Sequence, residues 1–142
     1  MSIATKTESD VQGFFFQLVK ESPLASAVSG NVYRASADSS CRPRDSRLED
    51  IEVIVTSSSA ELQEGVVTVL VYVPDTDPYD NGVKVKDGAR TAQLERIAQD
   101  WFDTCPESGS EYSLSLTDTI GSIAIPEIGQ HAVSVQIRYE IH

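Results

Sequence analysis

Apolar residues recur at helical spacing in two stretches of the chain, and this pattern predicts two amphipathic helices. The first runs from Thr7 to Glu21, with an apolar stripe at Val11, Phe14, Phe15, Leu18 and Val19. The second runs from Ala89 to Cys105, with its stripe at Leu94, Ile97, Ala98, Trp101, Phe102 and Cys105. Because both stripes need cover, we expect Trp101 to be a core anchor and Cys105 to be an inert buried thiol.

Phe16 departs from the stripe of the first helix, since three adjacent phenylalanines cannot share one face. Its side chain points to the flank of the stripe or outward, where it either contacts a partner chain or is covered by loops of its own chain. Ser22 and Pro23 end this helix because the residue before a proline avoids the α region. Residues 24–28 are then expected to form one more helical turn.

Period-two patterns predict a central pair of strands at residues 50–56 and 66–73. The second strand is apolar on both faces, so it belongs in the middle of a sheet. In the connection between them, Ser58 precedes Glu61 by three residues, which is the spacing of a capping box. Gly65 follows where a short helical turn would stop, so we expect a hairpin with one helical turn at its tip.

Shorter patterns add a strand at residues 31–35, another from Tyr112 towards Ile125, and a last one at residues 132–141. The last strand alternates cleanly, with apolar residues at odd positions and polar residues at even ones. The resulting order predicts an α+β fold, with an antiparallel-rich sheet of four to five strands and two main helices packed on one face. At 142 residues, the chain is expected to form a single domain over residues 1–142.

Two polar segments interrupt these elements. Residues 36–47 lack periodicity and carry Arg42, Arg44 and Arg47, which either form a docking site for an acidic neighbour or belong to a solvated loop that balances nearby acids. Residues 74–88 contain two prolines, two glycines and an Asn-Gly pair, which predict a surface excursion with a small hairpin. Its candidate interface residues are Asp75, Asp77, Tyr79 and Asp80.

Charge narrows the function classes. With 11 Lys and Arg against 22 Asp and Glu, the formal net charge is −11, which argues against a surface that grips nucleic acid. The charge serves either solubility or the repulsion of DNA. The amino-terminal stretch has no long apolar region and no stretch approaches a membrane span, so neither a signal peptide nor a membrane association is expected. The two cysteines have no metal or redox spacing.

Candidate catalytic groups are scarce. The two histidines, His131 and His142, have neither metal-ligand spacing nor a neighbouring nucleophile motif. The excursion at residues 74–88 fails as a calcium loop, because Gly88 stands where a bidentate glutamate is needed. We therefore expect no enzyme activity, no metal and no cofactor.

The segments RPRDSRLEDIEVIV, LQEG and VVTVLVYVPD resemble small structural proteins of tailed bacteriophages and prophages, of the tail-terminator or tail-completion kind. The later segments ARTAQLERIAQDWF and IAIPEIGQHAVSVQIRYEI extend the resemblance, which covers roughly residues 32–141. It implies an α+β sandwich of helices on a sheet. It also implies a ring, expected to be a hexamer or a dodecamer, that caps the tail tube and joins tail to head.

The same resemblance implies the partners: further copies of the chain, the tail tube, and the head-completion or connector proteins. DNA would pass through the ring without sequence-specific binding, and the protein would reside in the tail or neck of the virion after assembly in the host cytoplasm. The excursion at residues 74–88 would be a lumen loop, a docking arm for a neighbouring ring, or decoration. Alternatives are a head-proximal connector ring, an adaptor module of a toxin or secretion system, and an enzyme with a pocket lined by His131.

Overall fold

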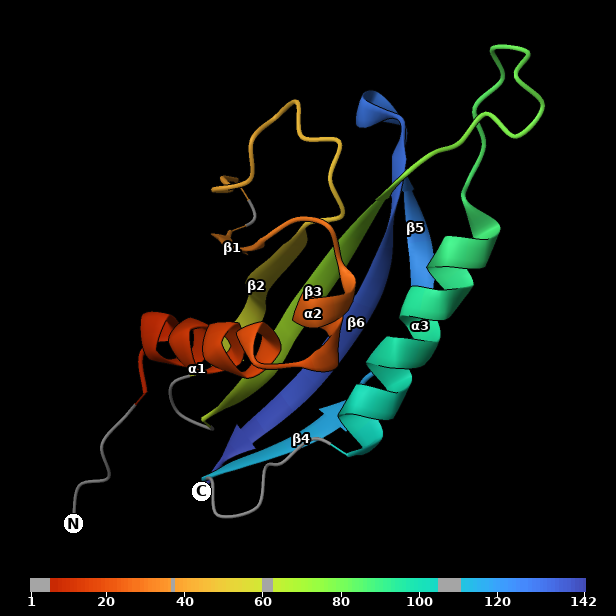
Figure 1. Ribbon diagram of the computed structural model, residues 1–142. Helices are drawn as coiled ribbons and strands as arrows, with labels where there is room; N and C mark the ends of the chain where they lie inside the picture. The colour runs from red at the N-terminus through yellow and green to blue at the C-terminus, as the bar shows by residue number, and fades with distance from the viewer. Residues whose placement is uncertain (1–5, 37, 60–62, 105–110) are drawn as a thin grey trace.

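A computed structural model describes residues 6–36, 38–59, 63–104 and 111–142 (Figure 1). The fold is α+β, with a mixed but mostly antiparallel six-stranded sheet against which two main helices pack, as the sequence predicts. The elements in chain order are α1 (Glu8–Lys20), α2 (Pro23–Ala27), β1 (Val32–Ala35), β2 (Ile51–Ser59), β3 (Glu64–Pro74), α3 (Gly88–Asp103), β4 (Tyr112–Leu116), β5 (Gly121–Ile125), a 3-10 turn (Pro126–Ile128) and β6 (Gln130–Ile141).

The sheet is built around β3 and β6, its two longest strands. Its order is β1-β2-β3-β6-β4, and β5 pairs with β6 beyond the end of β4. All pairs are antiparallel except β1 with β2, which run parallel. Because β3 lies between β2 and β6, the prediction that this strand is central is confirmed.

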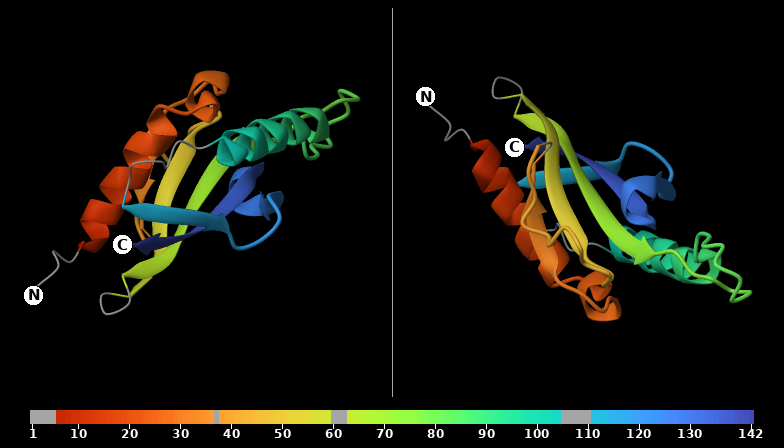
Figure 2. Two further views of the ribbon diagram at one scale, coloured as in Figure 1. Left: turned by 90° about the horizontal axis from the view of Figure 1, so that it is seen from below. Right: turned by 90° about the horizontal axis from the view of Figure 1, so that it is seen from above.

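The core lies between one face of the sheet and the helices, which cover that same face (Figure 2). Alternate residues of β3 and β6 point inwards and are fully buried, among them Val67, Val69, Val71, Val133, Val135 and Ile137. The α1 stripe supplies Val11, Phe15 and Val19, and α3 supplies Leu94, Ala98 and Trp101. The role expected for Trp101 as a core anchor is therefore confirmed, whereas Cys105 lies outside the described residues.

The ends of both helices follow from local chemistry. Thr7 and Asp10 form a reciprocal capping box at the start of α1, in which each side chain accepts a hydrogen bond from the other residue's backbone N–H. These bonds lower the pKa of the Asp10 carboxyl below its ordinary value. Asp87 caps α3 by accepting a hydrogen bond from the Arg90 N–H. Pro23 opens α2, the additional turn that the sequence predicts after α1.

Two local predictions differ from the structure. The helical turn expected between Ser58 and Gly65 is wrong at both ends, because these residues pair with each other in extended strands; residues 60–62 lie outside the described part. Gly65 instead leaves room beside Tyr139, its cross-strand partner on β6, where an added Cβ would approach the phenol oxygen to 2.7 Å.

The segment after residue 112 forms two strands, which raises the strand count from the expected four to five to six. The ladder changes at Thr117, whose N–H donates to the Gln136 carbonyl oxygen. Beyond it, the chain turns and buries Ile120 before β5 begins. The split arises because the polar residues between Leu116 and Ile120 interrupt the apolar alternation, although Thr117 still bonds to Gln136 of β6.

Candidate interaction surfaces

Residues 74–88, called the arm below, project from the end of β3 beyond the first turn of α3 (Figure 1). Thr76 and Val85 exchange two backbone hydrogen bonds of 2.8 Å, so the two sides of the arm are paired. This pairing confirms the small hairpin predicted for the segment, with Val85 on its second side. The arm is therefore a shaped projection and not an open loop.

Hydrogen bonds also fix the tip of the arm. The Asp77 carboxylate accepts hydrogen bonds from the N–H groups of Asn81 and Gly82 at 3.0 and 2.8 Å. These two bonds lower the pKa of Asp77 below its ordinary value, because they stabilise the charged form. Asp80 and Gly82 adopt left-handed backbone conformations, with φ of 53° and 82°. Asp77 thus shapes the tip, whereas the Asp80 side chain is exposed.

The outer surface of the arm is apolar as well as acidic. Tyr79 is 83% exposed, Val83 is 59% exposed and Val85 is 45% exposed. Among the described residues, these three belong to a group of only five large hydrophobic side chains with high exposure. A cluster of exposed apolar side chains on one projection is typical of a protein-binding surface.

The base of the arm is anchored on both sides. Asp75 donates its backbone N–H to the Gly129 carbonyl oxygen, and its carboxylate lies 2.7 Å from Nδ1 of His131. On the other side, Arg90 of α3 pairs with Glu49 through two hydrogen bonds and donates a third to the Ala27 carbonyl oxygen. The arm therefore leaves the body of the protein in a defined direction.

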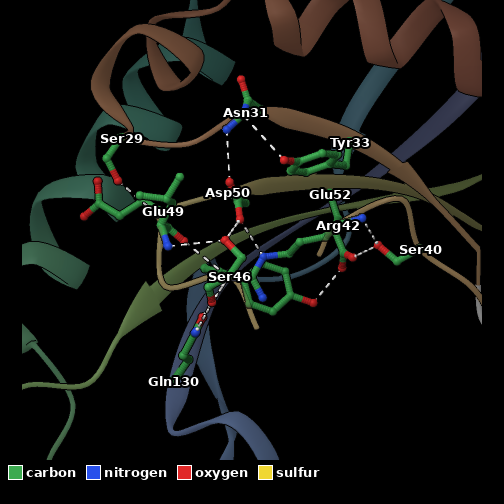
Figure 3. Close-up of polar contacts among 12 residues, drawn as sticks. Ser29, Asn31, Tyr33, Ser40, Arg42, Ser46, Glu49, Asp50, Glu52 and Gln130 are labelled. Atoms are coloured by element: carbon green, nitrogen blue, oxygen red, sulfur yellow. Dashed lines mark hydrogen bonds and ion pairs between the residues drawn. The ribbon is translucent and has the colours of Figure 1, made fainter. Parts of the chain in front are cut away.

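Arg42 is buried in a polar network that attaches residues 38–49 to the sheet (Figure 3). Its Nε lies 2.8 Å from the Asp50 carboxylate, and the two side chains are only 5% and 0% exposed. Nη2 donates to Gln130 at 3.0 Å and also to two backbone carbonyl oxygens of the same loop. Because its guanidinium is engaged within its own chain, Arg42 has a structural role and is not presented to an acidic neighbour as the docking-site reading expects.

The aromatic side of this network is Tyr72 of β3. The Arg42 guanidinium stacks 3.9 Å from the centre of the Tyr72 ring, and the Tyr72 hydroxyl donates to Glu52 at 2.6 Å. Burial, together with the neighbouring Glu52 carboxylate, raises the pKa of Tyr72 well above the ordinary tyrosine value. Ser40 donates to the other carboxylate oxygen of Glu52. The loop is thereby held over the face of the sheet that the helices leave open.

This attachment forms a groove of about 600 Å³ between the loop and strands β2 and β3. Leu70, Ile54 and Tyr72 contribute to its lining from the strands, while Arg44 and Asp38 contribute from the loop. Arg44 is exposed and also lines a second groove of about 310 Å³, shared with Arg47, Glu127, Ile128 and Gln130. Arg47 is exposed and donates to the Ile128 carbonyl oxygen at 2.9 Å. We name the first of these hollows the loop groove.

The remaining interface candidate, Phe16, is half-buried on α1. The guanidinium of Arg34 lies 4.6 Å from the centre of its ring, and the Lys20 ammonium lies 5.7 Å away on the same helix. Side chains of its own chain thus cover part of the ring through cation–π contacts. The structure brings Arg44 and Arg47 together, and it groups Asp75, Asp77, Tyr79 and Asp80 on the arm, but Phe16 stands apart from both groups.

Sequence reasoning missed Tyr72 and Gln130 as partners of Arg42, and it missed Glu52, which binds Tyr72. Glu52 and Tyr72 interrupt otherwise apolar strands, and a charged residue inside such a strand was the available signal. Gln130 lies 88 residues away from Arg42, and no local pattern indicates that they meet. His131, the residue named for the enzyme alternative, contacts Asp75 at the base of the arm and lines neither of the two grooves described above.

No protein-family model matches the chain, and a search of curated proteins finds no match to it. Across residues 6–36, 38–59, 63–104 and 111–142, no three His, Cys, Asp or Glu side chains gather closely enough to hold a metal ion. In the same part of the chain, no helix combines the length and the apolar character needed to cross a bilayer.

Proposed function

We propose that the protein is a structural component of a tailed bacteriophage virion, which forms a ring that terminates the tail tube or joins the tail to the head. The observation that carries this proposal is the arm, an anchored projection with exposed Tyr79, Val83 and Val85. Such a projection serves contact with another protein, because the exposed apolar surface is stabilised only when a partner covers it. The resemblance of residues 32–141 to tail-terminator and tail-completion proteins supports the same assignment.

The arrangement of the two surfaces supports a ring. The arm lies at one side of the molecule, while residues 36–47 lie on the other side of the sheet in each view (Figures 1 and 2). Contacts between two different surfaces of identical subunits are heterologous, and they close into a ring when the rotation between subunits allows it. A ring also covers sheet edges, such as β5, that would otherwise stay open to pairing.

The acidic composition supports a passage for DNA. A formal net charge of −11 for each chain of 142 residues gives any ring of several copies a strongly negative surface. Phosphate groups are repelled by such a surface, so DNA moves through without binding to a sequence. In this proposal, the head-completion proteins and the tail tube contact the two ends of the ring.

The test is the assembly state of the purified chain. Light scattering after size exclusion, over a range of protein concentrations, is expected to show a cyclic oligomer of the 15.5 kDa chain, and negative-stain images are expected to show rings. A chain that remains monomeric or dimeric at every concentration, and does not bind phage tail tubes, would favour the adaptor alternative and overturn the ring.

A further inference from the structure

Asn81 and Gly82 form an asparagine–glycine pair at the tip of the arm. We propose that Asn81 is a modification site, at which the side-chain amide closes onto the Gly82 nitrogen and loses ammonia, and that Asp77 restrains this reaction. Both residues of the pair are exposed, so water reaches them. This chemistry is a property of the single chain and does not depend on the proposed ring.

The reaction needs no partner other than water. The Gly82 nitrogen loses its proton and attacks Cγ of Asn81; a new C–N bond forms, and the side-chain nitrogen leaves with a proton as ammonia. Glycine favours this closure because it has no Cβ that would crowd the nitrogen. Water then opens the cyclic imide at either of its two carbonyl carbons. The product at position 81 is aspartate or isoaspartate, and neither an oxidant nor a reductant is consumed.

The side chain of Asn81 is oriented for this closure. Its Oδ1 accepts a hydrogen bond from the Val83 N–H at 3.0 Å, which is the arrangement of an Asx-turn. A side chain bonded to the residue two positions ahead lies alongside the backbone between them, which includes the Gly82 nitrogen. The Val83 N–H also lies where negative charge develops on Oδ1 during the attack, and a donor at that place stabilises the transition state.

The attacking nitrogen, by contrast, is held by Asp77. The Gly82 N–H donates to Oδ2 of this carboxylate at 2.8 Å. Attack requires the nitrogen to lose its proton, and the negative charge that develops there would face the carboxylate, which disfavours it. Asp77 is also a poor base for this proton, because the backbone hydrogen bonds that it accepts lower its pKa. Asp77 therefore restrains the closure and does not catalyse it.

Asn31, the other asparagine of the chain, is an internal reference. It is also exposed, but Val32 follows it, and the branched side chain of Val32 crowds the approach to the next backbone nitrogen. Val32 also begins β1, which is paired with β2. Asn31 is therefore expected to keep its amide under conditions in which Asn81 reacts.

The product changes the arm in two ways. A carboxylate at position 81 adds a negative charge between Asp77, Asp80 and the second side of the arm. Isoaspartate also carries the chain through its side-chain carbon, so the backbone gains a methylene group next to Val83. The modification consequently alters the surface on which Tyr79 and Val83 are exposed.

Mass spectrometry of the full chain, incubated at neutral pH and then digested with trypsin, tests the site. The peptide from Leu48 to Lys84 carries Asn81, and chromatography separates its aspartate and isoaspartate forms. Asp77→Ala is expected to accelerate ammonia loss about 10- to 100-fold, the factor that corresponds to loss of a hydrogen bond to a charged group. A synthetic peptide of residues 79–85, which lacks Asp77, is expected to react as fast as this variant.

Two further variants serve as controls. Tyr79→Ser changes a tip side chain that is 83% exposed, and it is expected to react like the unaltered chain. Asn81→Gln is expected to keep its amide, because the longer side chain closes a larger ring. If Asp77→Ala unfolds by circular dichroism, Asp77→Asn replaces it; the asparagine introduced there precedes Pro78, which has no N–H, so it cannot close in the same way.

The outcomes decide the proposal. Equal rates for the unaltered chain and the Asp77 variant, or an unaltered chain as fast as the free peptide, would show that Asp77 restrains nothing. Equal acceleration by Tyr79→Ser would show that any loosening of the tip suffices. Ammonia loss from Asn31 ahead of Asn81 would exclude the site itself. None of these measurements depends on assembly, so a chain that forms no ring leaves them unchanged.

Discussion

Removal of the Arg42 charge is expected to destabilise the fold strongly. The substitution Arg42→Met keeps an unbranched apolar stem over Tyr72 but removes every N–H that the guanidinium donates. Asp50, which is fully buried, then retains only the Asn31 N–H and the Ser46 hydroxyl as donors among the described residues. Breaking a buried ion pair by removing one partner costs about 3–5 kcal/mol, because a charge remains buried without compensation.

That magnitude is large for a chain of this size. The free energy of unfolding of small domains is about 5–15 kcal/mol, so the substitution is expected to remove a large fraction of the stability. At roughly 4 °C for each kcal/mol, the midpoint of thermal unfolding is expected to fall by about 12–20 °C. The loss of stability is expected to be accompanied by release of residues 38–49 from the sheet, since Arg42 also donates to Gln130 and to two carbonyl oxygens of that loop.

Urea unfolding followed by the fluorescence of Trp101 measures the effect, since this single tryptophan is 4% exposed in the fold. The matched control is Arg96→Met, which breaks an exposed pair with Asp100 at 3.7 Å. Exposed pairs contribute about 0–1 kcal/mol, so the control is expected to unfold almost like the unaltered chain.

A double-mutant cycle separates the pair from its surroundings. Asp50→Asn keeps the size of the side chain and an acceptor for the Asn31 N–H, but it leaves the Arg42 charge uncompensated. The double variant is expected to be more stable than the sum of the two single losses indicates, with a coupling of about 0.5–3 kcal/mol. Equal unfolding midpoints for Arg42→Met and Arg96→Met would refute the buried-pair reasoning.

Two glycines and one tyrosine give further tests. Gly30→Ala is expected to lower the free energy of unfolding in urea by about 1–3 kcal/mol, because its Cβ would meet Asp50 and the Glu49 carbonyl oxygen. Gly13→Ala, in open space within α1, is expected to raise the free energy of unfolding by about 0.5–1 kcal/mol. The reverse order of stabilities would contradict the packing. Burial raises the pKa of Tyr72, so its contribution is complete below about pH 10, the ordinary tyrosine pKa, and is lost as the pH rises through the folded value. Unfolding measured from neutral to alkaline pH, with tyrosinate absorbance recorded in parallel, is expected to show declining stability above about pH 10 and a weaker decline for Tyr72→Phe; identical profiles would contradict the assignment.

The elements that rest on periodicity were predictable. The stripes of α1 and α3 and the alternation of β6 are long, and each matches one repeat over its whole length. The hairpin tip was not predictable in the same way, because Ser58 and Gly65 suit both a capped turn and a strand end. Pairing of β3 with β6, through contacts distant in the sequence, decided in favour of the strand.

In the candidate surfaces, too, contacts between residues distant in the sequence decide what the local sequence could not predict. Arg42 and Arg44 flank a single proline and have nearly the same local sequence, yet one is buried and the other is exposed. The difference depends on Asp50, Tyr72 and Gln130, which reach Arg42 only through the folded sheet. By contrast, the arm was predictable from its own turn residues, since its shape depends on bonds between near neighbours.

The position of β6 has a consequence for biosynthesis. This strand pairs with β3, β4 and β5, yet it follows all of them along the chain. While the polypeptide is being translated, the inner valines of β3 therefore lack their principal neighbour until the final strand has left the ribosome. Sheets completed by such late, long-range pairing fold slowly and pass through aggregation-prone intermediates. Nascent chains of this protein are consequently expected to expose the inner valines of β3 until β6 has been translated.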